Sequence, residues 1–384
     1  MKEIIKVERK RILNNKSFLI IIAIISVVSI ISSLSSLKKY NVYDQSGNII
    51  ISGKDNLKES KLDKHNRLLD EKAILDIVER KDKSKFLYNS NVVTLVAANY
   101  EKKLEDLNDE DISNFYNQRI ENVARNLGGA AMVEDIKSVV QNAKNNLKTP
   151  IEVGYAEGWK NLNNDLIDFT TIIIFIIPFI IIPIFGEDPK IKMKGLYTST
   201  KYGKRDLVKG KIITGLSVGA IIYIISVGIF SISKLLVLGF KGANLPIQSS
   251  VKYLYCPYDL IYFEQYLINI FIGFMAMLFL VAITLLITSI LEQILSSAIV
   301  VAFILVTMTM LPNNNFEFNH FFKHFLPYSM TNFNNYYIHP EIYNIFGKIV
   351  PMYTLVLLVA LIVCVVSVSL TLFISNKKLL RGLK

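Results

Sequence analysis

The sequence is poor in the residues from which enzymes and metal sites are usually built. It has two cysteines, one tryptophan and four histidines in 384 residues. Two cysteines, of which Cys364 lies inside an apolar run, exclude a disulfide framework and a cysteine-ligated zinc cluster. The nearest approach to a phosphate-binding loop, Gly53-Lys54-Asp55, lacks a following Ser or Thr. We therefore expect no catalytic residue and no metal site in this chain.

Charge is also missing from the interiors of six long apolar runs. Each run has close to the roughly 20 residues that a helix needs to cross a bilayer. The mean hydropathy of the whole chain is +0.38. Proton-coupled carriers, ion pumps and voltage sensors use ionisable residues within the membrane. Their absence from these runs predicts that any active transport draws its energy from a partner.

The blocks of apolar residues predict an all-α polytopic membrane protein with six transmembrane helices and a mainly helical extracellular domain between the first and second. The predicted order is a cytoplasmic amphipathic elbow at 1–17, a first span at 18–37, the extracellular domain at 38–166, a second span at 167–185, a cytoplasmic loop at 186–211, a third span at 212–233, an extracellular connection at 234–265, a fourth span at 266–291, a fifth at 294–311, an extracellular aromatic-rich stretch at 312–348, a sixth span at 349–375 and a cytoplasmic tail at 376–384.

The charge distribution orients this topology. The chain carries a formal charge of +11, and much of the Lys and Arg excess lies beside apolar runs at 1–17, 186–211 and 376–384. Short basic segments next to spans stay in the cytoplasm, so both termini are predicted there, and no nucleic acid is expected as a partner. A cleaved signal peptide is the alternative for the first span, since Ser33 and Ser35 are small residues behind a basic start. Richness in Lys, Asn and Ile is typical of AT-rich bacterial genomes, so the plasma membrane of a bacterium is expected.

The extracellular domain has its own local pattern. Residues 42–53 predict a short hairpin that turns at Ser46-Gly47-Asn48. Helical periodicity follows, with Asp111 or Ser113 as the cap of one helix and Gly128-Gly129 at its end. No substrate motif is present. After the third span, an aromatic-rich connection with Tyr253 and Tyr262 is suited to the level of the lipid head groups.

Three features surround the loop at 186–211. Pro178 and Pro183 each lack a backbone donor, which predicts a bend in the second span just before Glu187. Gly215 and Gly219 form a small-xxx-small step, which indicates a close helix contact within the chain or between two copies. The loop opens with Glu187, has Gly195 and Leu196 in its middle, and closes with basic residues that include Lys204, Arg205 and Lys211.

This order of segments resembles the type-2 ABC exporter permeases that carry a large insert after the first helix. The resemblance implies a permease of lipids, peptides, antibiotics or polymers, paired with a second copy or a sister permease. ATP and Mg would be bound by a separate ABC ATP-binding subunit, with no cofactor in this chain. Leu196 and Tyr197 would be anchors in the ATPase. The residues expected to couple transport to the ATPase are Glu187, Lys194, Gly195, Leu196, Tyr197, Lys204, Arg205 and Lys211.

Other interpretations stay open. The loop lysines could only hold the loop against anionic lipid. The assembly could transmit force to the extracellular domain without transport, or the chain could be a membrane scaffold or sensor with no ATPase. His320 and His324 stand four residues apart, which suits either packing at an interface or, less readily, a metal ion.

Overall fold

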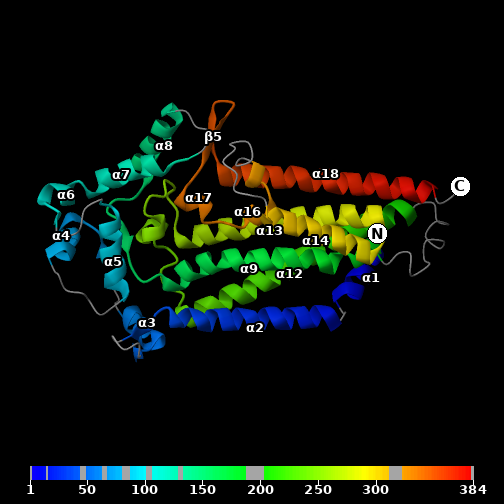
Figure 1. Ribbon diagram of the computed structural model, residues 1–384, viewed down its shortest axis with the longest axis horizontal. Coiled ribbons are helices and arrows are strands. Elements are labelled where there is room, and N and C mark those ends of the chain that lie inside the picture. The colour runs from blue at the N-terminus through cyan, green and yellow to red at the C-terminus, as the bar shows by residue number, and fades with distance from the viewer. Residues whose placement is uncertain are drawn as a thin grey trace.

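The computed structural model of the chain describes residues 2–13, 16–43, 49–62, 67–79, 87–100, 106–128, 133–186, 203–310 and 322–381. The described part is mostly helical, and its long helices lie side by side in one bundle with a smaller, irregular domain at one end (Figure 1). This agrees with an all-α polytopic chain.

Among the described residues, five helices are long and apolar enough to cross a membrane. A sixth apolar helix, α14 (Ile294–Met310), has 17 residues and is shorter than the others. The lengths and composition indicate a membrane protein, whereas six crossings and the side of each loop stay predictions. The five longer helices are α2 (Lys16–Lys38), α9 (Glu157–Ile181), α12 (Gly203–Leu238), α13 (Tyr262–Leu291) and α18 (Met352–Arg381).

Helix α13 lies at the centre of the bundle. It packs against α9, α12, α14 and α18, and its fully buried residues include Ile272, Met277 and Leu285. Helix α2 packs mainly on α12 and leaves most of its surface exposed. Its buried face contains Ser29 and Ser33, each of which donates its hydroxyl to a carbonyl one turn earlier in the helix. Such back-bonded small residues let two helices approach closely.

We call the end of the bundle at which α12 begins the loop end. The opposite end, which carries the domain between α2 and α9, is the insert end. The last turns of α18 and helix α1 (Lys2–Leu13) both lie at the loop end (Figure 1). Helix α1 packs on the beginning of α12, where Arg9 Nε donates to Ser217 Oγ at 2.9 Å. The turn between α13 and α14 is also at this end, and Glu292 in it has a left-handed backbone with φ of 52°.

The predicted boundaries of the third span need correction. Helix α12 begins at Gly203 and ends at Leu238, so it contains the last part of the predicted loop and continues past the predicted end at 233. The second span likewise begins earlier, since α9 starts at Glu157 and not at 167. Polar residues that the sequence analysis assigned to loops and to the extracellular domain therefore lie within long helices.

The insert is the domain between α2 and α9. Strands β1 (Val42–Tyr43) and β2 (Ile49–Ile51) pair in an antiparallel manner, which confirms the hairpin; its turn at 44–48 lies outside the described residues. The remaining elements are α3 (Gly53–Leu62), β3 (Arg67–Leu68), α4 (Glu71–Glu79), α5 (Leu87–Ala98), α6 (Asp109–Ser113), α7 (Phe115–Asn126), α8 (Val133–Asn146) and β4 (Glu152–Val153).

The predicted cap residues of the insert were wrong. Asn108 caps α6: its Oδ1 accepts from Asp111 N at 2.8 Å, and Asp111 Oδ2 accepts from Asn108 N at 3.2 Å. This reciprocal pair satisfies two backbone donors that a helix start leaves without partners. Gly128 follows α7 but pairs with the distant Glu341 in a β-bridge, because Gly128 N donates to Pro340 O at 3.1 Å.

Several contacts fasten the insert to the bundle. Leu254, from the connection after α12, belongs to the small core of the insert. Arg119 of α7 is 1% exposed and donates from Nε to Leu254 O at 3.0 Å; burial lowers the pKa of its guanidinium to about 10. Asn126 donates to Ile338 O, and Asn344 donates to Asp135 Oδ1 at 2.9 Å.

Two connections lie at the insert end, one after α12 and one after α14, and their described parts pack against the rest of the protein. They contain η2 (Ile247–Ser249), η3 (Val251–Tyr253), α16 (Pro327–Met330), α17 (Asn335–Ile338) and the hairpin of β5 (Ile342–Ile345) with β6 (Lys348–Pro351). Tyr253 and Tyr262 are buried, and Tyr253 OH donates to Asn334 Oδ1 at 2.7 Å. Both rings therefore pack inside the protein, and the level of this connection relative to the lipid head groups stays a prediction.

Candidate functional site

The predicted coupling residues fall largely outside the described part of the chain. Glu187, Lys194, Gly195, Leu196 and Tyr197 lie outside the described residues, as does His320. Lys204 and Arg205 belong to the first turn of α12, and their side chains are not described. Only Lys211 of this group has a described side chain.

Lys211 joins the two helices that flank the loop. It is 2% exposed, and its Nζ donates to Ile184 O at 2.7 Å and lies 5.3 Å from the centre of the Phe185 ring. Ile184 belongs to α10 (Pro183–Gly186), the short helix that leads into the loop. The ammonium group therefore ties α10 to the third turn of α12 by a charge-assisted hydrogen bond.

Two glycines bring further elements to the same place. A Cβ on Gly186 would lie 2.9 Å from Ile294 Cγ1 at the start of α14, and a Cβ on Gly210 would lie 2.9 Å from Ile4 Cγ2 of α1. We call Ile4, Ile184, Gly186, Gly210, Lys211 and Ile294 the loop base. It joins α1, α10, α12 and α14 at the point where the loop leaves and re-enters the bundle.

The predicted helix bend coincides with an interruption of the second span. Pro178 lies inside α9, which ends at Ile181, and Pro183 is the first residue of α10. Ile182 between them keeps helical dihedral angles, with φ of −47° and ψ of −43°, and donates to Pro178 O at 3.1 Å. The size of any bend stays a prediction.

Gly215 and Gly219 lie at helix contacts within the chain. A Cβ on Gly215 would lie 2.9 Å from Leu285 Cδ2, and one on Gly219 would lie 3.1 Å from Met277 Sδ, both in α13. Residues 215–219 also match the GxSxG pattern of serine hydrolases, which the sequence analysis missed. That motif requires a strand–turn–helix elbow, whereas Ser217 lies within α12, bonded to Arg9.

A buried ion pair crosses three helices at the insert end. Lys234 of α12 is fully buried, and its Nζ lies 2.5 Å from Asp165 Oδ2 of α9, 2.6 Å from Ser36 Oγ and 3.0 Å from Ser32 O of α2. Asp165 and Lys234 both lie in candidate spans. They lie outside the runs predicted at 167–185 and 212–233, so the absence of charge from the span interiors stays a prediction.

The sequence analysis missed this pair because it ended the third span at 233 and began the second at 167. The apolar run Leu235 to Leu238 after the lysine was the signal that the helix continues. A charged residue inside a continuing apolar helix needs a partner, which Asp165 provides.

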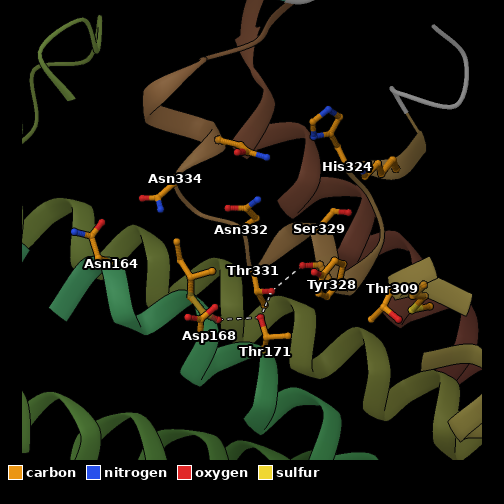
Figure 2. Close-up of a pocket in the computed structure, with 14 residues that line it drawn as sticks. Asn164, Asp168, Thr171, Thr309, His324, Tyr328, Ser329, Thr331, Asn332 and Asn334 are labelled. Atoms are coloured by element: carbon orange, nitrogen blue, oxygen red, sulfur yellow. Dashed lines mark hydrogen bonds between the residues drawn. The ribbon is translucent and has the colours of Figure 1, made fainter. Parts of the chain in front are cut away.

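A polar pocket of about 670 Å³ lies between α9, the end of α14 and the segment 323–335 (Figure 2). Helix α9 contributes one face at intervals of three or four residues: Asn164, Ile167, Asp168 and Thr171. Such spacing places side chains in one row along a helix. Thr309 comes from the last turn of α14, and the opposite wall carries residues between Lys323 and Asn335.

The walls of the pocket are held together by hydrogen bonds. Thr171 Oγ1 and Thr331 Oγ1 lie 2.6 Å apart and connect α9 to the segment that follows α16 (Figure 2). Asn164 Oδ1 accepts from Lys252 Nζ at 2.6 Å. His324 Nε2 lies 3.1 Å from Glu341 Oε1, which pairs this histidine with an acid.

Other polar groups in the pocket keep their bonding capacity. Within the part of the chain that the structure describes, the side chains of Asp168, Ser329, Asn332 and Asn335 make no hydrogen bond or ion pair. The pocket can therefore both donate to and accept from a polar ligand. Across the described residues, no group of three or more His, Cys, Asp or Glu is placed to hold a metal ion. Comparisons of the chain with protein-family models, with curated proteins and with solved structures give no match.

Proposed function

We propose that this chain is the membrane subunit of an ATP-driven exporter of the type-2 ABC class. A separate ATPase subunit would bind ATP and Mg, and a second copy or a sister permease would complete the membrane part. Work would enter through the loop at 186–211. The observation that carries the proposal is the loop base, in which Lys211 Nζ binds Ile184 O at 2.7 Å.

The loop base suits the transfer of motion from a cytoplasmic partner. A force on the loop acts on α10 and α12 together, because Lys211 ties one to the other. Helices α1 and α14 touch the same place through Ile4 and Ile294. The loop is thus fastened to four helices, whereas a loop that only anchors the chain to anionic lipid needs no such support.

The course of the chain supports six crossings in this proposal. Helix α1 and the last turns of α18 lie at the same end of the bundle (Figure 1). Both termini share one side only if the number of crossings is even, so α14 counts as a crossing. Its 17 residues are at the lower limit of what a span needs. The basic segments at 1–17, 186–211 and 376–384 then all lie in the cytoplasm of a bacterium.

A second candidate is force transmission without transport, in which ATP hydrolysis moves the insert. The specific observation in its favour is the fastening of the insert to the bundle through Arg119, Asn126 and Asn344. In this alternative the ATPase still couples through the loop. A substrate-dependent stimulation of ATPase activity separates the two, since a purely mechanical device has no exported substrate.

The loop is tested with Leu196→Asp and the matched control Lys192→Gln, each co-expressed with the ABC ATPase that this proposal requires as a partner. We expect Leu196→Asp to abolish ATPase association or stimulated turnover while the chain still inserts and folds. The control should retain both activities. Full association and stimulated turnover in Leu196→Asp would reduce the loop to an anchor. Labelling of Lys201→Cys from outside intact cells would overturn the orientation.

A further inference from the structure

The lining of the polar pocket is unusual for its shortage of both charge and apolar surface. Nine of its fourteen residues are Asn, Ser, Thr or Tyr, and only Ile167 and Met308 are apolar. Side-chain amides and hydroxyls both donate and accept hydrogen bonds. A ligand that matches such a lining carries many groups of the same dual kind.

The charges in the pocket do not favour an ion of either sign. Asp168 and Lys323 carry opposite charges, and His324 lies against the carboxylate of Glu341. Phosphate sites are usually built from several Arg or Lys side chains or from backbone donors at a helix start. Cation sites need several carboxylates or an aromatic cage. Neither arrangement lines this pocket among the described residues.

The backbone of the facing wall is held in place before a ligand arrives. Thr331 is fully buried and bonded to Thr171 across the pocket, and its Oγ1 also donates to Tyr328 O at 2.8 Å. Successive backbone turns hold the next residues, with Asn332 N donating to Ser329 O at 3.1 Å and Asn335 N donating to Asn332 O at 3.1 Å. A lining fixed in this way loses little entropy on binding.

We propose that this pocket binds a saccharide of one or two rings, either free or as the head group of a glycolipid. Sugar hydroxyls donate and accept, which matches the unpaired amides of Asn332 and Asn335 and the carboxylate of Asp168. Tyr328 is 39% exposed and lines the pocket, and the apolar face of a tyrosine ring suits the C–H side of a sugar. The volume of about 670 Å³ is in the range of small-molecule sites.

The position of the pocket allows either source of the sugar. The α9 face that lines it begins in the polar first half of the helix and ends at Thr171, where the uninterrupted apolar run starts. A glycolipid could therefore place its head group in the pocket from the adjacent bilayer, and a free saccharide could enter from water. The role of this sugar as exported cargo rests on the exporter proposed above, whereas binding itself does not.

Binding is tested on the full chain in nanodiscs of phosphatidylglycerol and phosphatidylethanolamine. Alkyl maltoside detergents are avoided throughout, because their disaccharide head groups are themselves probes of the site. Maltose and cellobiose are titrated by saturation-transfer-difference NMR. A second set of nanodiscs contains diglucosyl-diacylglycerol, so that competition with the free disaccharide reveals a lipid source.

We expect saturable binding of a disaccharide by the unaltered chain. Asp168→Ala and Asn332→Ala should each weaken binding roughly fivefold to tenfold, because each removes one hydrogen bond to the ligand. The matched control Asn142→Ala changes an exposed asparagine of α8 and should bind as the unaltered chain does. Asp168→Asn should keep more affinity than Asp168→Ala, because the amide retains an acceptor. Competition by the glycolipid assigns the site to a lipid head group, and its absence assigns it to free sugar.

Three results would overturn the assignment: no saturable binding of sugar in either form, equal binding by the pocket variants and the control, or displacement of the sugar by inorganic phosphate or phosphocholine. The two proposals fail separately. If no sugar binds but Leu196→Asp uncouples the ATPase, only the pocket assignment is contradicted. If sugar binds but Leu196→Asp leaves ATPase association and turnover unchanged, only the coupling assignment is contradicted.

Discussion

Helix α12 is tied to the second span by one buried lysine at each end, and the two ties differ in kind. At the insert end, Lys234 meets a carboxylate, with Asp165 Oδ2 at 2.5 Å. At the loop end, Lys211 meets a backbone carbonyl, Ile184 O at 2.7 Å. A buried ion pair is costly to break on one side, because it leaves a charge behind. Loss of the Lys211 ammonium leaves the Ile184 carbonyl, a neutral acceptor, without this donor.

The glycines at the two ends repeat this difference. At the insert end, a Cβ on Gly158 would lie 1.9 Å from Gly239 O, so two backbones touch. At the loop end, a Cβ on Gly210 would lie 2.9 Å from Ile4 Cγ2 and 3.5 Å from Ile4 Cβ, which are side-chain atoms, whereas one on Gly186 would lie 3.2 Å from the backbone N of Ile294. The interruption at Ile182 separates the two ties, since Asp165 precedes it and Ile184 follows it. The insert end is therefore built to stay fixed, and the loop end to adjust.

Lys234→Ala should have the largest effect on stability. It leaves Asp165, whose side chain is 24% exposed, without its main partner. The expected loss is about 3 kcal/mol of unfolding free energy, at the low end for a broken buried pair because of that exposure. Titration of the solubilised protein with sodium dodecyl sulfate, followed by circular dichroism, measures it.

The control for this prediction is Lys39→Ala. Lys39 lies 3.6 Å from the other oxygen of Asp165 and is 60% exposed, so its removal should cost less than about 1 kcal/mol. If both variants lose the same stability, the ion pair of Lys234 is not what fixes the insert end.

The next largest difference is expected between Gly158→Ala and Gly210→Ala. The first forces a backbone shift against Gly239 O and should cost about 2–3 kcal/mol. In the second, rotation of Ile4 relieves the contact, and the better helix propensity of alanine, about 1 kcal/mol, offsets what remains. The same titration checks both. Equal losses would show that the loop end is as rigid as the insert end.

Lys211→Met should cost less than Lys234→Ala, about 1.5 kcal/mol, because it removes one charge-assisted hydrogen bond and leaves the carbonyl of Ile184 without this donor. Methionine keeps the apolar stem that packs near Phe185. Cysteine cross-linking between α10 and the start of α12 reports whether the two separate. A loss as large as that of Lys234→Ala would remove the difference between the ends.

Much of the fold could be predicted from the sequence, because apolar blocks report helices directly. The turn between the helices that end at 291 and begin at 294 and the hairpin at 42–53 agree with their predictions. The predicted boundaries of the second and third spans differ from the helix boundaries where a helix continues through polar residues, as at Asp165 and Lys234. Helix length there depends on a partner in another helix, and a single sequence does not reveal such pairing.

The site was harder to predict for a related reason. The polar face of α9, with Asn164, Asp168 and Thr171 at helical spacing, is visible in the sequence, but its facing wall comes from residues 323–335, far along the chain. Asparagine-rich stretches such as Asn332 to Asn335 resemble ordinary loops by composition. Among the described residues, the bond between Thr171 and Thr331 and the contact between the rings of Phe175 and Tyr328 join the two walls.

The smallest expected effect is the coupling energy in the double variant Lys211→Met/Lys234→Ala. The two lysines are 23 positions apart in one helix, about 35 Å at a rise of 1.5 Å per residue, and they bind α10 and α9 on opposite sides of the interruption at Ile182. Changes so far apart with no shared partner usually add within about 0.5 kcal/mol. The unfolding free energies of the two single variants and the double variant give the coupling. A coupling above about 1 kcal/mol would mean that strain at one tie reaches the other through α12. The ends would then act as one rigid unit, and the distinction between a fixed and an adjustable end would be lost.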